Sequence, residues 1–184
     1  MIRLRDIMTL DVATVSPEAT LREAAELLAD GYVSGAPVVA GTRVVGVVSA
    51  ADIVDFVADD PGVPTERPEH VEPGEWPEVE PWVEGEESPS AYFVDFWSDA
   101  GADVEVRMES TEGPEWNVMD EHTVADVMSR RVISLGRDTS VREAARLMLE
   151  AGVHRILVLE DGRLAGLVTN TDVLKAVSQY GIAG

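Results

Sequence analysis

Two short stretches of the sequence place a hydroxyl side chain three residues before an aspartate. They are Ser49 to Asp52 in GVVSAAD and Thr169 to Asp172 in GLVTNTD. An apolar run precedes each hydroxyl and a helix-like run follows each aspartate, so a strand should pass into a helix there. A helix start can hold phosphate, and an aspartate can accept bonds from both hydroxyls of a cis-diol. The same spacing is also that of a plain capping pair, and spacing alone leaves both interpretations open.

The two stretches belong to a repeat that runs through most of the chain. With a constant offset of 120 residues, Met8 aligns with Met128, Arg22–Ala25 with Arg142–Ala145, and Gly46 with Gly166. Self-similarity over this length predicts two homologous units, residues 1–59 and 121–184, separated by an insert at residues 60–120.

Each unit is expected to fold in the order β-α-β-β-α. Thr20 with Glu23 and Ser140 with Glu143 have the capping-box spacing that starts a helix, and Gly31 and Gly152 should end those helices in a left-handed conformation. Strands are predicted at residues 12–15, 36–40, 44–48, 132–135, 155–159 and 164–168, and second helices at 50–58 and 170–180. One such unit cannot cover its apolar face alone. We therefore expect an α/β (α+β) fold in which the two units pack together.

Composition excludes several kinds of protein. The chain has 184 residues, no cysteine and a formal net charge of −21. The lack of cysteine excludes disulfides and cysteine-bound zinc. Residues 60–122 hold two arginines against nineteen acidic residues, which argues against nucleic acid as a partner. This acidity fits either a protein adapted to a high-salt cytoplasm or a protein from a GC-rich genome that carries one acidic loop. No run is long enough for a signal peptide or a membrane span, so we expect a cytoplasmic protein without membrane association.

The insert combines prolines and acidic residues with aromatic side chains. Residues 60–89 hold seven prolines, which predicts extended segments, yet all four tryptophans (76, 82, 97 and 116) lie in the insert. The stretch SAYFVDFWSDAG (90–101) could form a short helix with Tyr92, Phe93, Phe96 and Trp97 on one face. These rings either pack on the protein's own units or form a docking face for a partner. The acidic part could also lie over the basic second unit and compete with an anionic ligand.

Each unit resembles a CBS domain, and the two together resemble a Bateman module. The resemblance rests on VADVMSRRVISL (124–135), TLREAAELL (20–28), SVREAARLM (140–148), APVV (36–39) and the closing Gly, two apolar residues, Ser/Thr, two residues and Asp. It covers both units but not the insert. It implies paired clefts that bind adenosyl ligands, with the closing aspartate on the ribose, and the dimerisation of the pair. It does not indicate which process is controlled.

By this resemblance the second unit is better equipped for a phosphorylated ligand. His154 and Arg155 precede its strand, as in repeats of the AMP-activated kinase regulatory subunit, and Thr171 adds a hydroxyl. The structural alternatives are a satisfied, partly buried His154 and an ion pair of Arg155 with Glu160 or the insert. The resemblance implies nucleotide contacts by Val132, Ile133, Ser134, Val153, His154, Arg155, Val168, Thr169, Thr171 and Asp172, and more weakly by Val12, Ala13, Thr14, Val33, Ser49 and Asp52.

The expected function is that of a stand-alone adenine-nucleotide sensor. Binding of AMP, ADP or ATP, with S-adenosylmethionine or NAD as alternatives and no metal required, would change the contacts of the pair with an unknown effector protein. No enzyme is expected, because the histidines at 70, 122 and 154 share no metal-ligand spacing and no nucleophile motif is present. The alternative is a ligand-free module for oligomerisation or protein interaction.

Overall fold

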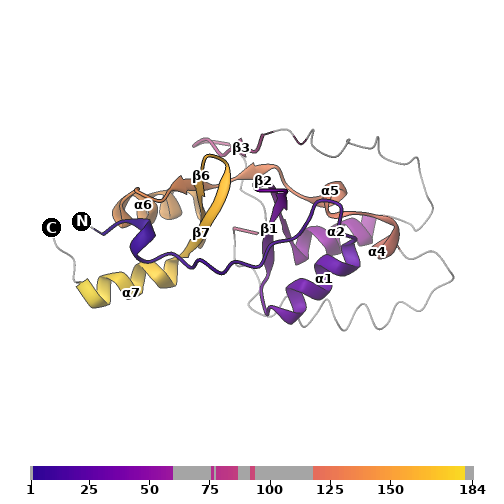
Figure 1. Cartoon of the computed structure of the whole chain (residues 1–184), viewed down its shortest axis with the longest axis horizontal. Helices are drawn as coiled ribbons and strands as arrows, with labels where there is room; N and C mark the ends of the chain where they lie inside the picture. The colour runs from indigo at the N-terminus through magenta and orange to yellow at the C-terminus, as the bar shows by residue number, and fades with distance from the viewer. Residues whose placement is uncertain (1, 60–75, 77, 87–91, 94–117, 181–184) are drawn as a thin grey trace.

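The computed structural model describes residues 2–59, 76, 78–86, 92–93 and 118–180 (Figure 1). The first unit contains α1 (Leu21–Asp30), β1 (Gly35–Ala40), β2 (Arg43–Ser49) and α2 (Ala50–Asp59). The second contains β5 (Ser134–Gly136), α6 (Val141–Ala151), β6 (Arg155–Glu160), β7 (Arg163–Thr169) and α7 (Asn170–Tyr180). The two units thus share the order α-β-β-α, which β5 precedes in the second unit, and the predicted mixed fold of helices and small sheets in two units is confirmed.

The two units differ in their first strand. In the second unit β5 pairs in parallel with β6, which pairs antiparallel with β7, and Leu157 donates its amide to the carbonyl of Ile133 at 3.1 Å. The equivalent position in the first unit is Pro37, which has no N–H to donate. The predicted strand at residues 12–15 is therefore wrong: only Val15 forms a bridge, with Val38, and β1–β2 stays two-stranded.

The ends of the first helices follow the expected caps with one exception. Thr20 accepts the amide of Glu23 at 3.1 Å, and the Glu23 carboxylate accepts the Thr20 amide at 2.8 Å. Ser140 accepts the amide of Glu143 at 3.2 Å and so caps α6. Gly152 is left-handed at φ 66°, as predicted. Gly31 is not, at φ −78°. Tyr32, which is the true repeat counterpart of Gly152, takes the positive φ of 49° instead.

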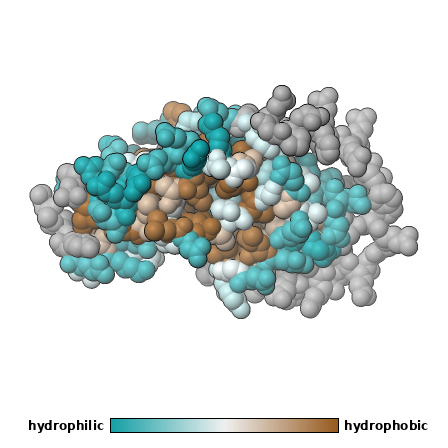
Figure 2. All heavy atoms as spheres, viewed as in Figure 1, coloured by the Kyte–Doolittle hydropathy of each residue, from teal (hydrophilic) through white to brown (hydrophobic). Residues whose placement is uncertain are grey.

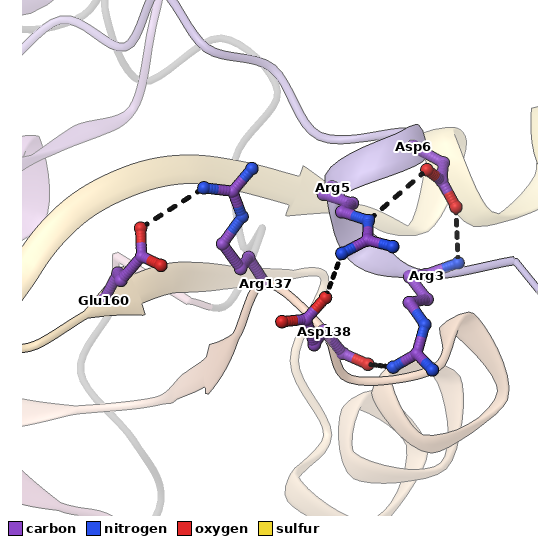
Figure 3. Close-up of polar contacts among 6 residues, drawn as sticks. All are labelled: Arg3, Arg5, Asp6, Arg137, Asp138 and Glu160. Carbon is purple, nitrogen blue, oxygen red and sulfur yellow. Dashed lines mark hydrogen bonds and ion pairs between the residues drawn. The ribbon is translucent and has the colours of Figure 1, made fainter.

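The N-terminal segment of the first unit packs on the second unit. In the short 3-10 helix η1 (Leu4–Asp6), Leu4 is fully buried in the apolar cluster of the second unit, and its amide donates to the Thr139 carbonyl at 3.0 Å. Figure 3 shows that Arg5 forms an ion pair with Asp138, and that the Arg3 guanidinium donates to the Asp138 carbonyl at 2.5 Å. The start of the chain is therefore part of the second unit's core.

The segment that precedes the second unit packs, in turn, on the first. It contains α4 (Val118–Glu121) and α5 (Val124–Val127), and Met119 and Val124 are buried in the first unit's cluster. The amide of Leu21 donates to the His122 carbonyl at 3.1 Å, and that of Val124 to the Ala19 carbonyl at 2.9 Å. Because each unit completes its core with the other's leading segment, the two cannot separate without exposing apolar surface.

The described part of the insert lies against both units. Its strand β3 (Glu80–Pro81) pairs in parallel with β4 (Arg131–Val132). Trp76 packs against the first unit's cluster, while Trp82, Tyr92 and Phe93 belong to or pack on the second unit's cluster. For these four rings the prediction of packing on the protein's own units is confirmed. Tyr92–Phe93 form a turn, and the rest of the helix predicted at 90–101 lies outside the described residues, as do the tryptophans at 97 and 116. Figure 2 shows apolar residues gathered at the middle of one face, with hydrophilic residues on either side.

Candidate functional site

The two Ser/Thr–Asp motifs adopt the same closed geometry at the junction of a strand and a helix. The amide and hydroxyl of Thr169 both donate to Oδ2 of Asp172, at 2.9 and 2.7 Å, and the Asp172 amide donates back to the hydroxyl at 3.3 Å. For Ser49 and Asp52 the corresponding distances are 2.8, 2.6 and 3.2 Å. Each motif therefore caps its helix. The cap uses one carboxylate oxygen, and Oδ1 of Asp172 lies 3.7 Å from the ammonium of Lys175.

The environments of the two aspartates differ. Ser49 is buried, and α2 places Asp55 one turn beyond Asp52. Burial raises the pKa of the Asp52 carboxyl above its ordinary value, the hydrogen bonds from Ser49 work against that rise, and the charge of Asp55 adds to it. The first motif thus holds a partly dehydrated carboxyl.

His154 connects the start of β6 to the start of α7. Its carbonyl accepts the amide of Asn170 at 2.9 Å, and its ring Nδ1 lies 3.2 Å from the Asn170 side-chain nitrogen. Because Asn170 follows Thr169, these bonds hold His154 beside the second motif. The sequence analysis missed Asn170, since nothing in the sequence pairs two residues that lie sixteen positions apart.

Of the two structural alternatives for Arg155, an ion pair with Glu160 or one with the insert, the pair with Glu160 does not form between these two described residues. Arg137 makes that pair instead, at 3.3 Å, as Figure 3 shows. The Arg155 guanidinium lies over the ring of Tyr92, 5.4 Å from its centroid. The arginine is therefore directed toward an aromatic side chain of the insert, at the distance of a cation–π contact.

We call Ile133, His154, Arg155, Thr169 and Asp172 the second site, and their counterparts Ala13, Ser34, Gly35, Ser49 and Asp52 the first site. The expected apolar walls of the second site, Val132, Ile133, Val153 and Val168, are all buried in the cluster that contains Tyr92 and Phe93. In the first unit Ala13 and Thr14 are exposed, and Val12 and Val33 are half-buried. The structure thus places the four predicted apolar residues of the second unit in one cluster, leaves Thr171 exposed, and leaves residues 12–14 unpaired with β1.

The described ranges contain neither a cluster of metal ligands nor a membrane-spanning helix. No group of three or more His, Asp or Glu side chains lies close enough there to bind a metal ion. No helix in the same ranges is both long and apolar enough to cross a bilayer. A cavity of about 610 Å³ lies away from both motifs, among Arg43, Trp76 and Gly162 at the hairpin turns.

The fold and the doubled motif define a CBS-domain pair, and the family comparison agrees. The CBS domain model matches residues 4–59 and 124–179. The chain belongs to the CBS-domain family and carries two CBS domains.

Relatives of known sequence match nearly the whole chain. An uncharacterized protein of Methanocaldococcus jannaschii is 26% identical over 178 residues, which are 96% of this chain and 40% of that protein. The chloroplastic CBS domain-containing protein CBSX1 of Arabidopsis thaliana is 26% identical over 95% of this chain and 62% of its own length. The chain thus spans less than two thirds of either relative.

Solved structures share the fold over the whole chain. CBSX2 in complex with AMP is 22% identical with a TM-score of 0.59, over 97% of this chain and 98% of that one. The CBS domain pair of protein MJ0100, in complex with 5-methylthioadenosine and S-adenosyl-L-methionine, is 17% identical with a TM-score of 0.57, over 97% of each chain. At these identities the likeness establishes the fold of a CBS pair.

Proposed function

We propose that this CBS pair is a regulatory module that binds an adenosyl ligand, with AMP, ADP or ATP as the preferred class, and that it transmits the bound state to an effector protein. The observation that carries the proposal is the cap at Thr169 and Asp172. It uses only Oδ2 of Asp172, so Oδ1 takes no part in the cap and can accept from ribose hydroxyls. The AMP complex of CBSX2 and the adenosyl complexes of the MJ0100 pair, which share this fold, support the choice of ligand.

The second site is proposed as the working site for a phosphorylated ligand. Asp172 holds the ribose, while Thr169, Thr171 and the start of α7 meet phosphate, because a helix start carries partial positive charge. Arg155 adds a charge-assisted bond, which Gly35 cannot supply at the equivalent position of the first site. The remaining proposed contacts are Val132, Ile133, Ser134, Val153, His154 and Val168, and in the first site Val12, Ala13, Thr14, Val33, Ser49 and Asp52.

Signalling requires that the ligand bind two arrangements of the pair with different affinity. The pair is suited to this because η1 of the first unit packs on the second unit, and α4 and α5 pack on the first. A ligand-induced movement at the start of α7 or β6 would therefore alter the packing of both units. In this proposal the pair is regulatory and not catalytic.

The test is thermal unfolding with AMP, ADP, ATP, S-adenosylmethionine and NAD, with GMP as the control that lacks adenine. A ligand at about 100 times its dissociation constant adds about 2.7 kcal/mol to the free energy of unfolding. We expect this stabilisation with at least one adenine nucleotide and not with GMP. No stabilisation by any of the five ligands, at low and at high salt, contradicts the proposal.

The second candidate function is a ligand-free interaction module. It is favoured by the apolar side chains that α6 and α7 expose, of which Leu149 is 85% and Leu174 67% exposed. Such side chains are typical of surfaces that meet another protein. The same thermal series separates the two functions, because an interaction module gains no stability from an adenosyl ligand.

A further inference from the structure

The insert places one aromatic pair between the two units. Tyr92 is 1% and Phe93 0% exposed, although both come from a segment remote from either motif in sequence. Their rings meet edge to face, with centroids 4.9 Å apart and an interplanar angle of 83°. The pair contacts both units, since the Phe93 carbonyl accepts the amide of His154 and the Tyr92 ring lies beside Gly35. Aromatic side chains buried this completely contribute strongly to the packing around them.

The pair occupies polar groups of the second site. The amide of His154 donates to the Phe93 carbonyl at 2.9 Å, and the Arg155 guanidinium lies over the Tyr92 ring. The walls of the second site are buried in the same apolar cluster as the pair. A ligand that uses Arg155 and those walls therefore meets Tyr92 and Phe93 first.

The first unit is shaped to receive the same ring. A Cβ atom added to Gly35 would stand 2.4 Å from Cδ2 of Tyr92, which is closer than any real contact, so no other residue fits beside the ring in this arrangement. Gly35 and Arg155 occupy the same position of the repeat. Gly35 leaves space beside the Tyr92 ring, and Arg155 places its guanidinium over that ring. The difference between the two copies therefore accommodates Tyr92.

We infer that Tyr92–Phe93 is an internal occupant of the second site, and that an adenosyl ligand must displace it to bind there. This inference rests on the proposed function, because it concerns the regulation of that same site. The apparent affinity of a site that is open for only a fraction of the time falls by that fraction. A minor open state of about 0.1–10% would weaken binding roughly 10- to 1,000-fold.

Calorimetric titration of AMP into the full chain tests the competition. The double variant Tyr92→Ala/Phe93→Ala should bind AMP at least about 10-fold more tightly than wild type. The control is Trp76→Ala, which removes an aromatic side chain of the insert that packs on the first unit's cluster, and it should leave the affinity unchanged. Equal or weaker binding by the double variant overturns the inference.

A second measurement needs no destabilised variant. Wild-type protein labelled with 3-fluorotyrosine gives a fluorine NMR resonance for buried Tyr92, assigned by its loss in Tyr92→Phe, and one for Tyr32, which is 96% exposed. On saturation with AMP the Tyr92 resonance should move toward that of Tyr32. If AMP binds and the Tyr92 resonance stays in place, the inference fails and the proposed function stands. If AMP binds neither wild type nor the double variant, both the proposed function and the inference are wrong.

Discussion

At the scale of single residues, the capping aspartates decide how each helix starts and what remains for a ligand. In each motif Oδ2 of the aspartate accepts two hydrogen bonds and the aspartate amide donates a third to the hydroxyl, so the two caps are equivalent. Their hydroxyl partners differ in burial, since Ser49 is buried and Thr169 half-buried, and their neighbouring charges differ as well. Burial is the leading cause of the raised pKa of Asp52, because it disfavours the charged carboxylate.

The raised pKa predicts how Asp52 affects stability. The folded state holds its proton more tightly than the unfolded chain, so the contribution of Asp52 is fully present below the ordinary value of 3.8 and is lost as pH rises through the raised value. Carboxyl NMR titration should give a midpoint above 3.8. Asp55→Asn removes a neighbouring negative charge and should lower that midpoint. A midpoint at or below 3.8 in the wild type would show that the Ser49 bonds outweigh burial.

Much of the candidate site could be predicted from the repeat. The motif gave both Ser/Thr–Asp pairs, and the offset showed that Arg155 and Gly35 are counterparts. The insert was one expected partner of Arg155, but the particular contact with Tyr92 could not be predicted, because the insert has no counterpart in the repeat. The contact of His154 with Asn170 depends on the register of β6 and β7, which fixes which side chains meet.

At the scale of elements, the packing of the N-terminal segments differs most from the two units predicted from the sequence. The segment with η1 packs on the second unit, and the segment with α4 and α5 packs on the first. The local patterns predicted most of the helices and both hairpins, because these features depend on residues that are close in sequence. The exchange of η1 and α5 is a long-range packing choice that local patterns do not contain. The absence of the strand predicted at residues 12–15 could have been predicted from the sequence. Alignment of the two units places Pro37 opposite Leu157, and a proline has no N–H to donate to residues 12–15.

The exchange predicts where a core substitution will act. Leu4→Ala should lower the free energy of unfolding by about 2–5 kcal/mol, because Leu4 is fully buried in the second unit's cluster. Leu10→Ala is the control, since Leu10 is 73% exposed and such changes stay within about 0.5 kcal/mol. Urea unfolding measures both.

Hydrogen exchange then shows which unit loses stability in Leu4→Ala. Leu4→Ala should reduce the protection of amides in β6 and β7 of the second unit more than that of β1 and β2. Loss of protection confined to β1 and β2 would mean that the N-terminal segment belongs to its own unit.

At the scale of the whole molecule, exposed apolar side chains on α6 and α7 point to self-association. Leu149, Leu174 and Val177 are among the large apolar side chains that remain exposed in the described residues. We propose that these helices meet those of a second copy, which would bury these exposed side chains. Light scattering should give the mass of a dimer, and Leu149→Glu/Leu174→Glu should give a monomer with unchanged helix content. A strict monomer across a wide range of wild-type concentrations rules this out.

The central claim is that the second site binds an adenosyl ligand through Asp172, and titration calorimetry with AMP tests it most directly. Asp172→Ala and Asp52→Ala remove the same cap bonds, so any difference between them reports on the ligand and not on capping. Loss of a charged hydrogen-bond partner costs about 1.5–3 kcal/mol, which is roughly 10- to 100-fold in affinity. We predict that Asp172→Ala weakens the tight binding event by this factor and that Asp52→Ala changes it less. If Asp52→Ala abolishes the tight event while Asp172→Ala leaves it intact, the assignment of the working site is wrong.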